Sequence, residues 1–370
     1  MWRYLHLLYL VGLASSEIYR LDFSFDGKPN GNVFQPGETV KGTAHFYNDK
    51  PDITNVQLKL IGDARAVDID DKKIKDRVYI KYFEEEKTLY SDKKPLGEGT
   101  HDFKFSLKLP KHIPTSYEYG NNAIRHYLQI SGVKINRIQC LVVADVDLSN
   151  DGSYEKPASV ECKLKVGLIK KSDFNIKMSL PKTGYVLGEP IRLNAPLENH
   201  SSYKIDKVFG ELAIYTNFLT VRNGRVFGVG DAPLKPTDAN VKVHTSDNAQ
   251  AARLFEPSSD EGKLEKQTLH LEIMSSKAGD APTMKLGIVP FAYIEWYVRV
   301  YVKFDSFLQD KLMCRIPVTI GTIPTKSVSF KHADSYALPN YGRGLLDDGE
   351  ATKWHGGHVY PVYAQFGKSQ

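Results

Sequence analysis

Alternating apolar and polar side chains make the segment from Phe103 to Ile130 the most regular part of the first half of the chain. Apolar residues occupy every second position from Phe103 to Leu109, and a similar alternation returns from Ile124 to Ile130. A period of two places one face of a strand in a core and the other in water. Pro110 and Pro114 lie between the two runs and exclude regular ladder pairing there. The pattern predicts a strand, a rigid loop and a second strand.

Alternation recurs along most of the chain, and no segment beyond the first sixteen residues sustains a helical period over three turns. We expect further strands at 18–25, 33–42, 56–60, 78–82, 160–166, 174–178, 208–212, 269–273, 294–304 and 312–320. The run 294–304 should form the centre of a core, with 312–320 as its hairpin partner. Short strands joined by turns predict antiparallel β-sandwiches. The polar, glycine-interrupted stretch 222–262 is expected to include a long mobile insertion.

A weak internal repeat indicates two copies of one architecture. At one constant separation, four positions of the first half match four of the second: Gly37, Glu38, Val40 and Asn48 match Gly188, Glu189, Ile191 and Asn199. An alternating strand follows each set, and similarity at domain length is typical of a duplicated fold. The alternative is a chance match, because few positions agree.

The length of 370 residues suits two domains and a tail. We place the first sandwich at 17–169, closed by the strand 160–166, and a linker at 170–173. The second sandwich is expected at 174–325, and the residues 326–370 are expected to form a flexible tail because alternation stops there.

The run FKFSLKLPKHIPTSYEYGNNAIRHYL, residues 103–128, resembles the central hairpin of arrestin N-domains. The shared features are an aromatic-rich strand, Leu-Pro, Pro-x-Ser, Gly and Ile-Arg-x-Tyr. In order over residues 17–325, the chain resembles the alpha-arrestins, or arrestin-domain-containing proteins. This resemblance implies an all-β fold of two tandem immunoglobulin-like antiparallel β-sandwiches of the arrestin type. It also implies a non-enzymatic adaptor, cytoplasmic at the plasma membrane or endosomes, that links membrane-protein cargo to ubiquitination and endocytic trafficking.

The composition is typical of a globular protein and limits the kinds of partner that we expect. Hydrophobic residues make up 41% of the chain and aromatic residues 11%, which is enough for packed cores. The net charge of +5 comes from 49 basic and 44 acidic residues, without a long basic run. We therefore expect no nucleic acid, whereas phosphorylated segments and peripheral membrane association stay open.

The three cysteines, Cys140, Cys162 and Cys314, contain no CxxC pair and no even framework. Cys162 and Cys314 alternate in phase with apolar neighbours, so we interpret both as small apolar core residues rather than metal or redox groups. This usage favours a reducing compartment.

The first sixteen residues favour a different compartment. A charged start, an apolar run from Tyr4 to Leu13 and the small residues Ala14, Ser15 and Ser16 are typical of a secretory signal peptide. The run is too short to span a bilayer comfortably, and the sequon at Asn199 weakly agrees with secretion. The alternative function is therefore a secreted or cell-surface protein with immunoglobulin-like binding domains. Resemblance to a cytosolic family favours an N-terminal extension instead.

Candidate catalytic and metal-binding groups each have a simpler explanation. The acidic run 68–71 lacks the glycine and distal glutamate of a calcium loop, so a solvated loop is expected. His355 and His358 have no further ligands nearby. Ser116 and His126 lie close in sequence, but no nucleophile elbow is present and His126 is in phase with an apolar face, so we expect a satisfied core histidine. Without phosphate or dinucleotide motifs, we predict no enzyme, no cofactor and no metal.

Two sets of residues remain as candidate binding sites. The first is a candidate phosphate-binding basic face made by Lys104, Lys108, Lys170 and Lys171. Its alternative is ordinary solubilising lysines. The second is Leu338, Pro339 and Tyr341, which resemble a Leu-Pro-x-Tyr variant of the Pro-Pro-x-Tyr ligand that alpha-arrestins present to WW-domain ubiquitin ligases. A short chance match in a tail is the alternative.

Overall fold

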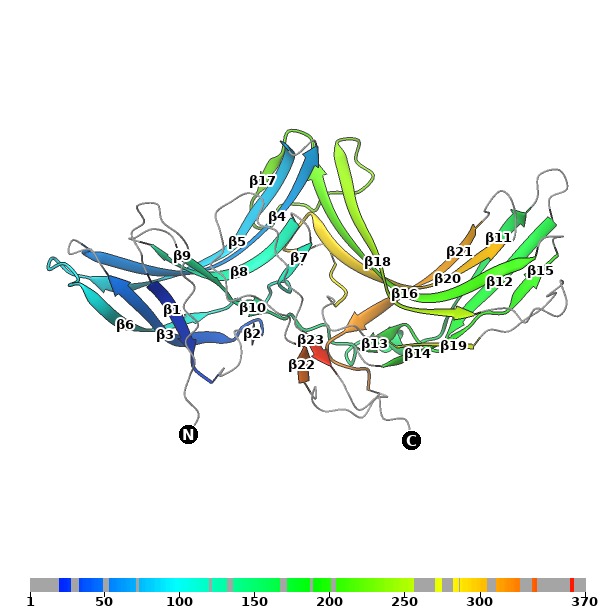
Figure 1. Cartoon of the computed structure of the whole chain (residues 1–370), viewed down its shortest axis with the longest axis horizontal. Coiled ribbons are helices and arrows are strands. Elements are labelled where there is room, and N and C mark those ends of the chain that lie inside the picture. Colours follow the sequence, from blue (N-terminus) through cyan, green and yellow to red (C-terminus); the bar gives the residue numbers. More distant parts are fainter. Residues whose placement is uncertain are drawn as a thin grey trace.

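The computed structural model describes residues 20–27, 33–48, 53–70, 73–119, 122–131, 136–166, 172–186, 189–200, 204–255, 270–274, 282–285, 287–304, 311–326, 335–337 and 360–362. This part of the chain consists of strands and one short 3-10 turn, Gly152–Glu155, without an α-helix. The all-β prediction is confirmed. The strands form two sandwiches that extend to either side of a raised centre (Figure 1). The expected leader, 1–16, lies outside the described residues.

The first sandwich contains a three-stranded sheet, in the order β1-β3-β6, and a larger sheet in the order β17-β5-β4-β8-β7, with β9 beside β8. Its strands are β1 Arg20–Phe25, β3 Thr39–Asn48, β4 Asn55–Asp70, β5 Lys73–Ser91, β6 Gly99–Lys108, β7 Tyr117–Tyr119, β8 Asn122–Ser131, β9 Asn136–Gln139 and β17 Arg225–Phe227. A short parallel pair, β2 Val33–Phe34 and β10 Leu141–Val142, accompanies them.

The second sandwich contains one sheet in the order β11-β12-β14-β19, with β15 beside β12, and another in the order β13-β21-β20-β16-β18. Its strands are β11 Ala158–Val166, β12 Ser172–Leu180, β13 Gly184–Val186, β14 Pro190–Asn194, β15 Leu197–Asn199, β16 Ile205–Val221, β18 Val241–Phe255, β19 His270–Met274, β20 Ala292–Phe304 and β21 Lys311–Gly321.

The strand β11 corrects the predicted division of the chain. It was expected to close the first sandwich, but all nine of its residues pair antiparallel with β12 in the second. The chain reaches the second sandwich even earlier, because the Val146 amide donates to Thr322 Oγ1 at 2.9 Å and the Leu148 amide donates to the Ile323 carbonyl at 3.1 Å. The segment 167–171 therefore connects two strands of one domain. Alternation locates a strand, but it does not show which strand is its partner.

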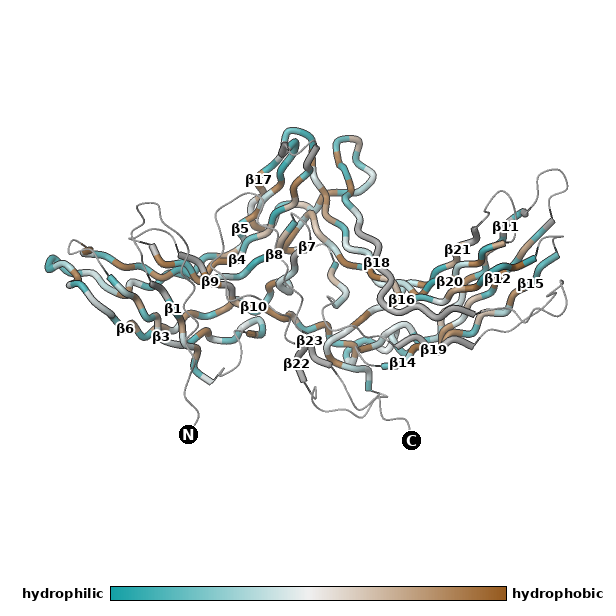
Figure 2. Tube along the Cα trace, viewed as in Figure 1, coloured by the Kyte–Doolittle hydropathy of each residue, from teal (hydrophilic) through white to brown (hydrophobic). Residues whose placement is uncertain are grey.

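The cores follow the predicted phases. In β20 the in-phase positions from Ile294 to Phe304 are all buried, and β21 is the antiparallel neighbour of β20, as predicted. Trp296, the largest of these residues, is 1% exposed. Figure 2 shows hydrophobic and hydrophilic positions interspersed along the strands of both sandwiches.

The segment around residues 103–130 differs from the predicted hairpin. Strands β6 and β8 do form where alternation placed them, but β6 pairs with β3 and β8 pairs with β4. The two strands therefore belong to opposite sheets, and the proline-containing connection crosses between them. At the end of this connection the Ser116 amide donates to the Val142 carbonyl at 2.8 Å.

The sequence repeat corresponds to one local structure built twice. In the first sandwich the Gln35 amide donates to Glu38 Oε2 at 2.9 Å, and the Glu38 amide donates back to the Gln35 carbonyl at 3.0 Å. In the second, Val186 and Glu189 exchange the same two bonds, both at 3.1 Å. Each turn leads into a strand of its own sandwich. Because the glutamate satisfies the same backbone donor in both copies, the structure supports the interpretation of the repeat as two copies of one architecture.

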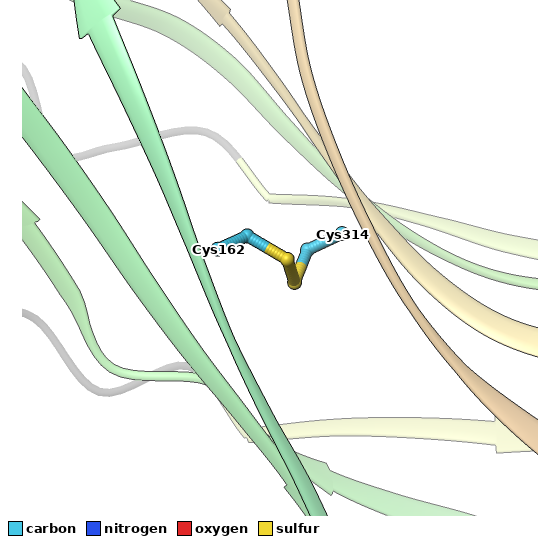
Figure 3. Close-up of a disulfide and its surroundings, with 2 residues drawn as sticks. All are labelled: Cys162 and Cys314. Carbon is cyan, nitrogen blue, oxygen red and sulfur yellow. A yellow bond between two sulfur atoms is a disulfide. The ribbon is translucent and has the colours of Figure 1, made fainter.

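The cysteines differ from the prediction. Cys162 on β11 and Cys314 on β21 form a disulfide across the two sheets of the second sandwich, with their Cα atoms 5.8 Å apart (Figure 3). The expectation that they are unpaired apolar residues is therefore wrong. Cys140 is buried and free, as expected of a core cysteine, and burial raises the pKa of its thiol. Two in-phase cysteines 152 residues apart do not reveal by spacing that their strands face each other.

Two segments expected to lack order contain strands. Within the stretch predicted as a mobile insertion, β17 pairs with β5, and β18 pairs with β16 along its whole length. Within the predicted tail, β22 Ser335–Ala337 and β23 Tyr360–Val362 pair antiparallel. Both predictions are corrected for these residues, because a partner strand can order a segment that has little apolar pattern of its own.

Candidate functional site

Part of the predicted site lies on described residues. Lys104 and Lys108 are exposed on the outer face of β6, in phase with each other as predicted. The remaining predicted residues are outside the described part of the chain: Lys170, Lys171, Leu338, Pro339 and Tyr341. The structure therefore describes only the β6 end of the basic face.

The structure adds a third lysine to this face. Lys41 on β3 is exposed and stands opposite Ser106, which lies between Lys104 and Lys108 on β6. Diagonal neighbours in a sheet have Cβ atoms roughly 7 to 8 Å apart, so the three ammonium groups can reach one anion. Thr43, opposite Lys104, adds a hydroxyl. We name Lys41, Lys104 and Lys108 the lysine face. Its third member was missed because β3 and β6 are far apart in sequence.

A hydrogen-bonded chain of Ser24, His45 and Asp102 crosses the same outer surface. Ser24 Oγ lies 3.0 Å from His45 Nε2, and His45 Nδ1 lies 2.8 Å from Asp102 Oδ1. This is the order of atoms in a hydrolytic triad, but such triads act in sites that exclude water and hold donors for an oxyanion. The Asp102 side chain is 61% exposed. We therefore interpret the chain of three as cross-strand surface hydrogen bonds.

A second histidine network is buried in the first sandwich. The His126 imidazole lies between two hydroxyls, with Nδ1 2.8 Å from Ser116 Oγ and Nε2 2.8 Å from Tyr82 OH. Ser116 Oγ also accepts the Val142 amide at 2.9 Å. Burial lowers the pKa of His126 to about 3. The prediction of a satisfied core histidine is confirmed.

The two sandwiches meet at the raised centre, where β17 extends the large sheet of the first sandwich through parallel pairing with β5 (Figure 1). The turn before β17 uses Asn223 and Gly224, whose φ angles are 69° and 68°, the left-handed values that this dipeptide tolerates. A side chain at Gly224 would meet the Arg77 carbonyl oxygen at 2.7 Å. The Asn223 amide donates to Asp76 Oδ1 at 2.8 Å. The turn therefore packs closely against the β4–β5 hairpin.

Two side-chain contacts join the sandwiches nearby. Tyr117 OH lies 2.6 Å from Thr216 Oγ1. Lys242 Nζ donates to both carboxylate oxygens of Asp68 at 2.8 Å. Asp68 is 4% exposed, so its predicted place in a solvated loop is wrong. A nearly buried carboxylate requires a counter-charge, and here the counter-charge comes from the other domain.

The second sandwich carries a cluster of tyrosine and arginine side chains on the outer surface of β16, β20 and β21. Arg299 is buried and donates to Glu211 Oε2 at 2.6 Å and to Tyr215 OH at 2.7 Å. The rings of Tyr215 and Tyr297 make an edge-to-face contact with centroids 5.1 Å apart. Arg315 is exposed, and its guanidinium lies over both rings, 4.4 Å from the Tyr297 centroid and 5.5 Å from the Tyr215 centroid. We name these five residues the tyrosine–arginine face.

Sequence analysis did not identify this face as a site, although its β20 members alternate with the core residues of the predicted strand. Strand register brings the rest together, because Arg299 stands opposite Glu211 on one side and Arg315 on the other. The available signal was the outward face of β20, which carries Tyr293, Tyr297 and Tyr301 together with Arg299.

The described residues contain neither a cluster of metal ligands nor a membrane-spanning helix. His, Cys, Asp and Glu side chains there do not gather in threes in a way that would hold a metal ion. His355 and His358 lie outside that part. The same residues contain no helix with the length and hydropathy needed to cross a bilayer.

Family comparisons agree with the two-sandwich architecture. The model of the arrestin (or S-antigen) N-terminal domain matches residues 21–143, and the model of the arrestin C-terminal domain matches residues 170–325. The two matches cover most of the chain and occur in the order that the family requires. The fold is therefore that of an arrestin-type two-domain scaffold.

Matches to individual proteins indicate which branch of the family this chain resembles. Arrestin domain-containing protein 1 of Mus musculus is 28% identical over 194 residues, which is 49% of this chain and 43% of that protein. The Homo sapiens protein of the same name is 27% identical over the same shares. The chain belongs to the arrestin family, in its alpha-arrestin branch of arrestin-domain-containing proteins. Each match covers less than half of the relative's own length.

Proposed function

We propose that this chain is a non-enzymatic adaptor that links the cytoplasmic segments of membrane-protein cargo to ubiquitination and endocytic trafficking. The observation that carries the proposal is the pair of arrestin-type sandwiches joined at the centre by strand pairing and by the ion pair of Asp68 with Lys242. Two joined sandwiches present wide sheet faces to a partner, as a scaffold requires. The proposed location is the cytoplasm at the plasma membrane or endosomes.

Cargo contact is proposed on the sheet faces. The lysine face offers three exposed ammonium groups beside hydroxyls, a combination suited to a phosphorylated cargo segment. The alternative explanation is that these lysines only keep the protein soluble. Peripheral association with an anionic membrane would use the same charge, and it would bring the adaptor close to its cargo.

Recruitment of a ubiquitin ligase is proposed for the motif Leu338, Pro339 and Tyr341. Pro339 fixes its own backbone near the polyproline helix and biases Leu338 toward an extended conformation, which reduces the entropy lost on docking. A WW domain would hold the proline in an aromatic groove and the tyrosine ring in a second pocket. Leucine in place of the usual first proline weakens the preorganisation, so we expect a Kd of roughly tens of micromolar.

The experiment that tests this function combines a peptide and the full chain. A peptide spanning Asp334 to Leu345 should bind WW domains of such ligases, and Tyr341→Ala should abolish binding, whereas Asn340→Ala at the variable position should not. In cells that lack the chain, surface membrane proteins that accumulate should return to normal with the wild type but not with Tyr341→Ala. Equal binding by the Tyr341→Ala peptide would contradict the motif, and unchanged surface proteins in the null cells would contradict the adaptor function.

A secreted or cell-surface binding protein remains the second candidate, and one observation favours it. The disulfide between Cys162 and Cys314 fits an oxidising compartment. The sequon fits it poorly, since Asn199 is 5% exposed and belongs to β15. N-terminal sequencing of the protein from its own cells separates the candidates: a start after the leader would favour secretion, and an intact start would favour the adaptor.

A further inference from the structure

We propose that the tyrosine–arginine face binds an acidic segment of a partner protein, with a carboxylate of that segment held by the guanidinium of Arg315. This inference rests on the proposed function, in which the chain binds segments of other proteins, and it adds a place and a chemistry to that binding.

The two arginines of this face differ in their hydrogen-bond and ion-pair partners. Arg299 and Arg315 stand directly opposite each other on β20 and β21, where like charges destabilise a sheet. Glu211 and Tyr215 compensate Arg299 through two short hydrogen bonds. Among the described residues, no carboxylate lies within ion-pair distance of Arg315, which is exposed and held only over tyrosine rings. An anion beside Arg315 would relieve the repulsion that the register creates.

The charge of this face favours a carboxylate over a phosphate. The Arg315 guanidinium carbon lies over both tyrosine rings, and its planar fork of donors can hold the two oxygens of a carboxylate. Within the five residues of this face Glu211 neutralises Arg299, which leaves the single positive charge of Arg315. A dianionic phosphate is better met where several cations gather, as on the lysine face.

The neighbours of Arg315 on β21 predict how the side chains of the ligand are spaced. Met313, Arg315 and Pro317 point outward at alternate positions and are all exposed, with Met313 at 42%. An extended segment that runs along β21 presents its own side chains with the same period of two. The expected ligand therefore carries an apolar residue two positions before and two positions after its acidic residue. Tyrosine, arginine and methionine are also the side chains enriched at protein interfaces.

The tyrosine–arginine face is preorganised for such a ligand. The edge-to-face contact of Tyr215 with Tyr297 and the bond from Arg299 to Tyr215 OH already fix these side chains. Little rotamer entropy is then lost on binding, which is a main cost of forming an interface.

Selection from a random dodecapeptide library tests the inference without a known partner. The library is panned on the full chain, on Arg315→Glu and on Lys165→Glu, a matched control because Lys165 is an exposed lysine of β11 in the same sandwich. We expect peptides with an acidic residue between apolar residues at two-residue spacing to be enriched on the wild type and on the control but not on Arg315→Glu. Enrichment that is independent of Arg315, or of any acidic residue, would overturn the proposal.

Binding of the most enriched peptide, synthesised and labelled, then measures the effect by fluorescence anisotropy. Arg315→Glu should weaken binding about tenfold to hundredfold, as expected for a lost charge-assisted hydrogen bond. Arg315→Lys keeps the charge and the fold but loses the planar fork, so it should also weaken binding, by less. Replacing the acidic residue with glutamine should match the Arg315→Glu loss. A phosphoserine peptide that binds more tightly than the glutamate peptide would overturn the carboxylate assignment.

Failure of this inference can be told apart from failure of the proposed function. If the Arg315 variants restore surface proteins in null cells as well as the wild type does, the tyrosine–arginine face is not the docking surface, while the adaptor function stands.

Discussion

Acidification from pH 7 to pH 5 should destabilise this protein through His126, which is fully buried between the hydroxyls of Ser116 and Tyr82. Neutral imidazole can donate at one ring nitrogen and accept at the other, and both hydroxyls can serve either role. A charged imidazolium in the same place would lose its hydration. Burial therefore lowers the pKa of His126 from 6.5 to about 3.

The sign and size of the effect follow from this difference in pKa. In the unfolded chain His126 titrates near 6.5, whereas in the folded chain it stays neutral down to about pH 3. The stabilisation is complete above pH 6.5 and is lost as the pH falls, because protons then bind the unfolded state preferentially. Each pH unit below 6.5 costs about 1.4 kcal/mol, so the loss at pH 5 is about 2 kcal/mol.

Urea unfolding at pH 7.5 and pH 5.0 measures this loss in the wild type and in His126→Gln, which can hydrogen-bond but does not titrate in this range. Other groups contribute equally to both proteins, so the wild type should lose about 2 kcal/mol more than the variant between the two pH values. His200→Gln is the matched control, because the His200 side chain is 57% exposed. If the wild type and His126→Gln lose the same stability, the buried neutral histidine is not the cause.

Two further predictions concern the second sandwich. Trp296→Ala should lower the free energy of unfolding by ~3 to 5 kcal/mol because the indole fills the core, whereas Tyr297→Ala on the outer face of β20 should cost clearly less; equal losses in chemical denaturation would show that the assigned phase is wrong. Reduction of the disulfide between Cys162 and Cys314 should lower the free energy of unfolding by at most about 5 kcal/mol, since it releases a loop with a separation of 152 residues in the unfolded chain. Denaturation with and without reductant, beside a thiol count by mass spectrometry, checks this; three free thiols in the untreated protein, instead of the single thiol of Cys140, or an unchanged midpoint, would contradict it.

Strand positions and their buried faces were predictable because alternation is a local property. The phase of β20 from Ile294 to Phe304 was assigned correctly, and His126 was correctly placed on an apolar face. The repeat around Glu38 and Glu189 was also visible, since the same turn needs the same carboxylate in both domains. The family resemblance rests on the same local patterns.

The hairpin of β20 and β21 was predictable, but only the tertiary structure decided which strands distant in sequence meet. Three contacts show this: the pairing of β11 with β12, the disulfide between Cys162 and Cys314, and the ion pair of buried Asp68 with Lys242. Each contact joins residues that are distant in sequence or belong to different elements. The tyrosine–arginine face depends on the same register, which sets Arg315 beside Arg299. The physical reason is that a strand's period of two states which side chains share a face, whereas the identity of the neighbouring strand is set by long-range packing and pairing.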